Sequence, residues 1–196
     1  MKTIYEAAVD AAVVDHMREY RRHGVLLLGP RNSGKVRAAR AAPDLMGEMS
    51  SLTKLLTREV CRHAHVDAPN ERPFRAPHSS TSMAGMVGLR GRPGEVSLAH
   101  GGVLLLDDLP AFSAGGVAAL VDALREQIVR FPLGDVVFPA RALVIATATP
   151  CPCGYRGARW QQAADRCRCA GEDIEAHMSL TLSFAESLNL AVVGAY

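Results

Sequence analysis

Residues 25–36 constrain the fold of this chain more than any other segment. An apolar run at 25–28 leads directly into Gly29-Pro-Arg-Asn-Ser-Gly-Lys35-Val36. This is the order of a phosphate-binding loop, G-x-x-x-x-G-K-[ST], in which backbone N–H groups and a helix N-terminus hold phosphates. Val36 stands where that motif has a hydroxyl ligand for Mg²⁺. The segment predicts a chain that holds a nucleotide but is poorly equipped to hydrolyse it.

Composition limits the other classes of protein. Hydrophobic residues make up 48% of the 196 residues, which indicates a packed core. The net charge of +2 by itself implies neither a nucleic-acid nor a membrane partner. The sequence contains no apolar run of the ~20 residues that a spanning helix needs, and its N-terminus lacks the features of a secretion signal. We therefore expect a cytoplasmic protein with no membrane partner.

Apolar strands that alternate with helices predict an α/β fold: a three-layer sandwich with a mostly parallel central sheet. The expected strands lie at 25–28, 102–106, 142–146 and 188–193, with another near Val60. The expected helices are 3–22, a helix from Gly34 that ends before Pro43, 50–58 and 117–128.

The whole chain, 1–196, is expected to form a single core domain with three inserted features. Residues 67–94 are rich in Pro, Gly, Ser and Arg and too long for an ordinary connection, which favours a functional insert. Residues 129–138 predict a β-hairpin, because two short apolar runs flank Pro132-Leu-Gly-Asp135. Residues 151–169 hold most of the cysteines and form a possible small zinc-binding segment.

A second motif supports nucleotide binding. The apolar strand at 102–106 ends in Asp107-Asp108-Leu-Pro, the form of a Walker B element whose first aspartate holds Mg²⁺. The alternative is a turn in which an aspartate caps a helix. Together with the loop, the motif favours an ATP and Mg²⁺ site. The predicted cofactor-binding residues are Gly29, Pro30, Arg31, Asn32, Ser33, Gly34, Lys35, Val36 and Asp107, the last also as the magnesium ligand.

Four of the five cysteines form two C-x-C pairs, Cys151 with Cys153 and Cys167 with Cys169. Four thiolates can close a tetrahedral Zn²⁺ site, and an odd cysteine number argues against a disulfide framework. The alternative is a set of reduced thiols without metal. Cys61 stands apart and is expected to be an inert core thiol.

Four longer stretches carry a family resemblance. They are Arg72-Pro-Phe-Arg-Ala-Pro-His78, Arg92-Pro-Gly-Glu-Val-Ser-Leu-Ala-His100, Gly102-Val-Leu-Leu-Leu-Asp-Asp-Leu-Pro110 and Ala148-Thr-Pro-Cys-Pro-Cys-Gly154. Over roughly residues 24–170 the chain resembles the magnesium-chelatase-like AAA+ ATPases, most closely the competence-associated ComM/YifB type. The resemblance implies an AAA+ core, assembly into a ring, the same four cysteines and, in the competence branch, action on DNA.

The chain departs from the family pattern at its catalytic positions. Val36 replaces a Ser or Thr, and Asp108 replaces the glutamate that polarises the attacking water. Thr149 replaces the asparagine that senses the γ-phosphate, and Ser187 stands where the family has its arginine finger. Asp108 and Thr149 are thus doubtful catalytic residues. We also expect the helical lid of the family to be missing from this chain. These changes predict weak or absent hydrolysis.

By the same resemblance, two inserts face the pore of a ring, where arginines could follow a DNA backbone. The alternative is ordinary solvated charge. The arginines concerned are Arg72, Arg75, Arg90, Arg92 and Arg130. The histidines at 63, 65, 78 and 100 show no ligand spacing and are expected to be surface or loop-ordering residues.

The first hypothesis is a nucleotide-binding pseudo-ATPase that acts by conformation, as a homo-oligomer or in a mixed ring with related AAA+ subunits. The alternatives are an active ATP-driven motor of the magnesium-chelatase or branch-migration helicase type, and a zinc-stabilised interaction module without nucleotide. A gene product without a selected function is a further alternative.

Overall fold

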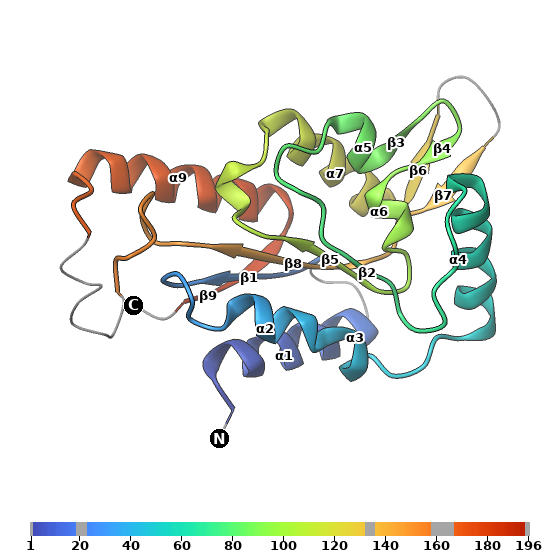
Figure 1. Ribbon diagram of the computed structural model, residues 1–196, viewed down its shortest axis with the longest axis horizontal. Coiled ribbons are helices and arrows are strands. Elements are labelled where there is room, and N and C mark those ends of the chain that lie inside the picture. The colour runs from blue at the N-terminus through green and yellow to red at the C-terminus, as the bar shows by residue number, and fades with distance from the viewer. Residues whose placement is uncertain (1, 19–22, 132–135, 158–166, 195–196) are drawn as a thin grey trace.

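A five-stranded parallel sheet forms the centre of the molecule (Figure 1). The computed structural model describes residues 2–18, 23–131, 136–157 and 167–194. The strand order of the central sheet is β2-β5-β8-β1-β9. Every pairing in this sheet is parallel, which agrees with the predicted, mostly parallel sheet. The strands are β1 Gly24–Leu28, β2 Phe74–Arg75, β5 Val103–Leu106, β8 Leu143–Ala148 and β9 Leu190–Gly194.

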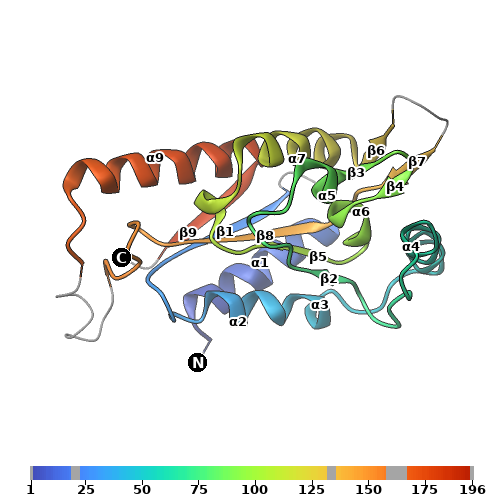
Figure 2. The same cartoon turned by 45° about the horizontal axis from the view of Figure 1, so that its top comes forward.

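Helices cover both faces of this sheet, as the turned view makes clear (Figure 2). One face carries α1 (Ile4–Arg18), α2 (Lys35–Arg40) and α3 (Ala42–Leu45), and the other carries α7 (Ala114–Glu126) and α9 (Gly171–Ser187). Alternate strand residues enter the two cores: Leu26 and Leu28 pack in one, and Val25 and Leu27 in the other. Burial of both faces explains why β1 and β5 are wholly apolar and β8 is apolar except for Thr147.

The remaining elements gather toward one end of the sheet, around α4 (Ser51–Ala64). They comprise α5 (Met83–Val87), α6 (Glu95–Leu98) and two antiparallel pairs, β3 (Gly88–Leu89) with β4 (Arg92–Pro93) and β6 (Ile128–Arg130) with β7 (Val137–Pro139). The exception is a 3₁₀ turn (Leu109–Ala111), which follows β5 and packs against α9 and β8. The pair β6–β7 provides the strands of the predicted hairpin; its turn, 132–135, lies outside the described residues.

The strand expected near Val60 is wrong, because this residue lies in α4. Ser50 caps that helix by accepting a hydrogen bond from the N–H of Thr53 (3.2 Å), and Thr57, Val60 and Cys61 are buried at helical spacing. The helix is therefore longer than the predicted 50–58. The structure describes the first helix to Arg18, whereas 19–22 lie outside the described residues. Residues 171–187, for which no element was predicted, form α9.

The segment 67–94 is mostly irregular, as expected, although it also supplies β2, α5 and the pair β3–β4. In the part of the chain that the structure describes, no helix is long and apolar enough to cross a membrane.

Candidate functional site

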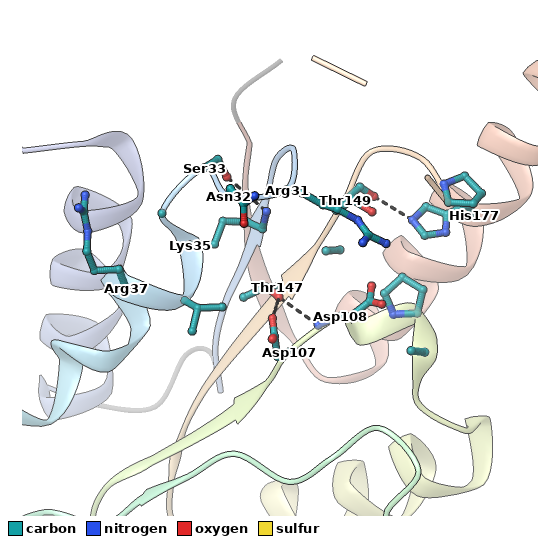
Figure 3. Close-up of a pocket in the computed structure, with 16 residues that line it drawn as sticks. Arg31, Asn32, Ser33, Lys35, Arg37, Asp107, Asp108, Thr147, Thr149 and His177 are labelled. Carbon is teal, nitrogen blue, oxygen red and sulfur yellow. Dashed lines mark hydrogen bonds between the residues drawn. The ribbon is translucent and has the colours of Figure 1, made fainter. Parts of the chain in front are cut away.

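The loop between β1 and α2 closes around the ammonium group of Lys35 (Figure 3). Lys35 Nζ donates hydrogen bonds to the carbonyl oxygens of Gly29 and Pro30, both at 2.7 Å, and to Ser33 Oγ at 3.3 Å. Gly34 directly precedes α2 with φ of 93°, a left-handed conformation that glycine adopts without strain. The sequence thus builds the tight loop and helix start that a phosphate site requires.

Lys35 is 7% exposed, and this burial has an electrostatic consequence. Desolvation lowers the pKa of Lys35 from 10.5 to about 8, while the negative charges of Asp107 and Asp108 act in the opposite direction. Burial disfavours the charged form of Lys35, and a bound phosphate would stabilise that form by its negative charge. The site therefore favours an anion as its ligand.

Helix α1 supports the loop from below through Tyr5, which sequence analysis did not single out. The Tyr5 hydroxyl donates to the carbonyl oxygen of Leu28 at 3.2 Å. A Cβ atom on Gly29 would lie 1.8 Å from the same hydroxyl oxygen. Gly29 is therefore required by a side chain from another element as well as by the phosphate motif.

Asp107 follows β5, and its carboxylate is held by the neighbouring strand β8. Thr147 donates its hydroxyl to Asp107 Oδ1 at 2.5 Å and accepts the N–H of Asp108 at 3.0 Å (Figure 3). The parallel register pairs Leu106 with Ala146, which brings Thr147 beside Asp107. Thr147 was not among the predicted site residues, although its place directly after the apolar run 142–146 was a usable signal.

Asp108 starts the short 3₁₀ turn in the left-handed conformation (φ 61°), yet its side chain makes no capping hydrogen bond. Asp107 and Asp108 are both exposed. The alternative interpretation, in which the side chain caps a helix, therefore does not fit the geometry. Both carboxylates line the same cavity instead.

Thr149 and His177 form the opposite wall of the site (Figure 3). The Thr149 hydroxyl donates to the carbonyl oxygen of Cys151 at 2.8 Å, so in this arrangement its proton is directed at the backbone. His177 Nε2 donates to the carbonyl oxygen of Thr149, also at 2.8 Å. His177 belongs to α9, the helix that sequence analysis did not assign. Ser187 is the last residue of α9, and its hydroxyl donates to the backbone carbonyl oxygen of Ser183 in the same helix at 2.8 Å.

These groups enclose a cavity of about 750 Å³, a volume within the range of small-molecule and cofactor pockets. Val36 lines it without offering an oxygen and packs against the core beneath. The described lining comprises Arg31, Asn32, Ser33, Gly34, Lys35, Val36, Arg37, Asp107, Asp108, Pro110, Ala111, Thr147, Ala148, Thr149, Pro152 and His177. The donor set fits a polyphosphate at the loop and a magnesium ion near Asp107.

The four paired cysteines lie together, with all four Sγ atoms within 4.8 Å of one another. The sulfur of Cys151 is 3.4 Å from that of Cys153 and 3.7 Å from that of Cys167. Tetrahedral zinc with Zn–S bonds of about 2.3 Å has its sulfurs about 3.8 Å apart, so the geometry fits that ion. Burial opposes ionisation of Cys151, but hydrogen bonds from the Arg156 N–H and the neighbouring thiols lower its pKa to about 7. Residues 158–166 of the cysteine segment lie outside the described residues.

The arginines predicted to face DNA have different roles. Arg72 donates four hydrogen bonds to backbone carbonyl oxygens, those of Met46, Gly47, Glu48 and Gly101, so its guanidinium fastens three chain segments together. Arg75 forms a two-pronged ion pair with Glu95 at 2.7 Å. Arg130 forms an ion pair with Glu126, with Nε 3.5 Å from Oε2. Arg90, in the turn between β3 and β4, and Arg92, in β4, are both exposed.

Of the two expectations for His100, a surface residue or a loop-ordering residue, its contacts fit the second, and the side chain is buried at 6% exposure. Its Nδ1 accepts the N–H of Arg141 at 3.3 Å, and its carbonyl oxygen accepts the hydroxyl of Thr57 at 3.2 Å. Burial lowers the pKa of His100 to about 4. Cys61 is buried as predicted, and burial raises its pKa.

Comparison with solved structures shows the fold. NtrX from Brucella abortus, in a crystal structure in complex with ATP, superposes with a TM-score of 0.57 at 14% identity, covering 97% of this chain and 36% of that one. A chain of the complex between subunits BchI and BchD of magnesium chelatase gives a TM-score of 0.57 at 21% identity, covering 93% of this chain and 66% of that one. The predicted AAA+ type of P-loop α/β fold is confirmed.

Comparison of sequences shows the family. Competence protein ComM of Haemophilus influenzae is 38% identical over 141 residues, and the uncharacterized protein YifB of Escherichia coli is 35% identical over 146 residues. In both cases the match covers 68% of this chain, which spans only 28% of the relative's length. The profile described as magnesium chelatase, subunit ChlI, matches residues 12–192. The chain therefore belongs to the magnesium-chelatase ChlI-like family of AAA+ proteins.

Proposed function

We propose that this chain is one AAA+ core that binds ATP with Mg²⁺ and hydrolyses it slowly. The observation that carries the proposal is the cavity between the phosphate-binding loop and the end of β5, with the Lys35 ammonium on one side and the Asp107 carboxylate on the other. A lysine and a Walker B aspartate across one cavity is the arrangement that holds a nucleotide triphosphate and its metal.

Binding depends mostly on groups that this chain retains. Backbone N–H groups of the loop do not depend on side-chain identity, and Lys35 supplies the point charge for the β- and γ-phosphates. Asp107 would hold Mg²⁺, with phosphate oxygens and water as the other ligands. When bound, the ion neutralises charge on the phosphates. ATP-bound NtrX has the same fold, which is consistent with this assignment of the pocket.

Slow hydrolysis follows from three side chains in the same cavity. Val36 has no oxygen for the metal. Asp108 is one methylene shorter than the glutamate implied by the family resemblance, and a misplacement of about 1 Å can lower a rate roughly 10²-fold. The hydroxyl of Thr149 already donates to Cys151 at 2.8 Å, so it would have to rotate to reach a γ-phosphate.

Calorimetric titration of the purified protein with ATP in excess Mg²⁺ tests the binding half of this proposal. We expect saturable binding that Lys35→Ala weakens by at least tenfold. Lys54→Ala is the matched control, because Lys54 is partly exposed on α4, where it pairs with Glu48, and lies outside the cavity. The absence of binding at high micromolar ATP would reject a nucleotide function and leave the zinc-stabilised interaction module.

Phosphate release tests the hydrolysis half, with Lys35→Ala as the blank. We expect turnover well below the 1–10³ s⁻¹ of typical enzymes. Turnover in that range, stimulated by DNA or by a partner and lost in Lys35→Ala, would favour the active-motor alternative instead.

Ring assembly and DNA contact are parts of the same proposal. We infer that the chain joins a homo-oligomeric or mixed ring, because its fold matches a chain of the BchI–BchD complex. Arg72 and Arg75 contact the protein itself, so Arg90 and Arg92 are the better candidates for DNA. Light scattering with and without ATP tests assembly, and DNA binding by Arg90→Ala/Arg92→Ala tests the contact.

We also propose that the four-cysteine cluster binds a structural Zn²⁺. Metal analysis of protein purified without added metal should give one zinc per chain. Replacing Cys167 by Ser should remove it, whereas replacing Cys61 by Ala should not, because Cys61 lies in α4 and outside the cluster.

A further inference from the structure

We propose that metal binding at the cysteine cluster positions the phosphate-binding loop, so that zinc and nucleotide bind cooperatively. This inference rests on the proposed ATP-binding function and on the zinc site. It assigns a positioning role to Gly154 and Arg31, which lie where the cysteine segment touches the loop.

The first contact is a direct hydrogen bond between the two sites. The N–H of Arg31, in the loop, donates to the carbonyl oxygen of Gly154 at 2.9 Å. The N–H of Gly154 donates in turn to the carbonyl oxygen of Cys151 at 3.0 Å. A single residue therefore connects a candidate zinc ligand to the phosphate-binding loop.

Side-chain packing reinforces this bond. Gly154 has φ of 80°, and a Cβ atom there would come within 2.4 Å of Arg31 Nε and 2.6 Å of Arg31 Cγ. The arginine side chain therefore lies directly over the glycine. Arg31 also lines the candidate nucleotide cavity, so its side chain contacts the cysteine segment and the nucleotide site together.

The second contact lies across the cavity. Thr149 donates its hydroxyl to the carbonyl oxygen of Cys151, and its own carbonyl oxygen accepts from His177 Nε2. Strand β8 ends at Ala148, just before these residues, and the carbonyl oxygen of Ala148 accepts the N–H of Gly29 at 3.1 Å. The position of Cys151 thus affects the loop on one side of the cavity and Thr149 on the other.

A metal ion would act on this arrangement by joining the two halves of the cysteine segment. Cys151 and Cys153 lie next to the loop, and Cys167 and Cys169 lie next to the start of α9, which carries His177. Among the described residues, thiol contacts join these halves, and without the ion, ordering the halves at nucleotide binding costs conformational entropy. With the ion bound, that cost is already met, so the nucleotide should bind more tightly.

The coupling between zinc and ATP can be measured, because it must act equally in both directions. If zinc raises the affinity for ATP by some factor, ATP must raise the affinity for zinc by the same factor, and such couplings are typically about 5- to 150-fold. The ATP affinity should be measured by calorimetry on the zinc-loaded protein, on chelator-treated protein, and after zinc is restored. Mg²⁺ in excess over nucleotide prevents ATP from carrying zinc itself. We expect removal of zinc to weaken ATP binding by about fivefold or more, and restoration to reverse the change.

Two glycines of the same segment provide a matched pair of variants. Gly154→Ala and Gly157→Ala both place a side chain at a positive φ, 80° and 76°, but a Cβ at Gly157 meets no described atom within 4 Å. In zinc-loaded protein, Gly154→Ala should weaken ATP binding by about fivefold, whereas Gly157→Ala should change it by less than twofold. Zinc content and melting temperature should be the same in both variants, which separates a positioning role from general damage.

The outcomes separate the inference from the function on which it rests. Equal ATP affinity with and without zinc, equal effects of the two alanine variants, or a wild-type protein that binds ATP but no zinc would each overturn the coupling and leave ATP binding intact. Zinc-loaded wild-type protein that fails to bind ATP would instead reject the proposed function itself.

Discussion

Lys35 offers the most quantitative test of the site, because its proton should respond to the nucleotide. Burial lowers the pKa of the free Lys35 ammonium to about 8, from 10.5 in an exposed lysine. A bound phosphate is an anion in contact with this ammonium and should return its pKa toward the ordinary value. Binding above neutral pH is therefore expected to take up a proton.

The expected proton uptake follows from the two pKa values. With pKa values of about 8 in the free protein and 10.5 in the complex, uptake is about 0.1 proton per ATP at pH 7, about 0.5 at pH 8 and about 0.9 at pH 9. The sign follows from the same values: ATP binds most tightly below pH 8, where Lys35 is already charged. Affinity should fall roughly tenfold between pH 7 and pH 9, or about 1.4 kcal/mol.

Calorimetry in two buffers with different ionisation enthalpies measures the uptake at each pH. Lys35→Arg is the informative variant, because arginine keeps its charge throughout this range. Any ATP binding that this variant retains should show no proton uptake between pH 7 and pH 9. Lys54→Ala should behave as wild type.

Two results would refute the reasoning. Uptake near zero at pH 8 in a wild-type protein that binds ATP would show that Lys35 is already fully charged in the free site. Uptake that persists unchanged in Lys35→Arg would show that another group takes up the proton.

Three further predictions concern catalysis and stability. Val36→Thr combined with Asp108→Glu restores an oxygen for the metal and one methylene of reach, and should raise ATP turnover at least tenfold in a phosphate-release assay; unchanged turnover would place the defect elsewhere. Arg72→Ala removes four hydrogen bonds to carbonyl oxygens and should lower the free energy of unfolding by roughly 3 kcal/mol in urea, whereas the exposed Arg90→Ala should stay within about 0.5 kcal/mol; equal losses would contradict the assigned role. The pKa of His100 is depressed in the folded chain, so its contribution to stability is present above pH 6.5 and is lost as the pH falls toward about 4, by up to about 3 kcal/mol; unfolding curves that do not differ in this way between wild type and His100→Gln would contradict it.

Much of the fold could be read from local patterns. Apolar runs identified four strands of the central sheet; three of them, β1, β5 and β8, are buried on both faces and keep their hydrophobic signal whatever their neighbours are. The phosphate-binding loop from Gly29 to Lys35 could also be predicted, since its backbone conformation is set by consecutive residues. Where two local signals competed, as at Val60, the helical face of α4 outweighed the preference of a β-branched residue for strands.

The parts that local patterns did not reveal all depend on contacts between distant segments. Thr147 reaches Asp107 only through the register of β5 and β8, and Tyr5 reaches the loop only because α1 packs beneath β1. His177 comes from a helix whose hydrophobic pattern is weak, and no motif announces it. Likewise, the family resemblance implied that Arg72 faces DNA, whereas packing directs its side chain into the protein.

The sequence by itself determined that this chain folds as a P-loop α/β core with a glycine-rich loop, a lysine and an aspartate-tipped strand, because those features are encoded by neighbouring residues. Only the tertiary structure decided that the cysteine segment touches the loop through Gly154 and Arg31. That contact joins residues more than a hundred positions apart in the chain. It exists because parallel strands β1 and β8 are adjacent in the sheet and bring both of their following loops to the same edge.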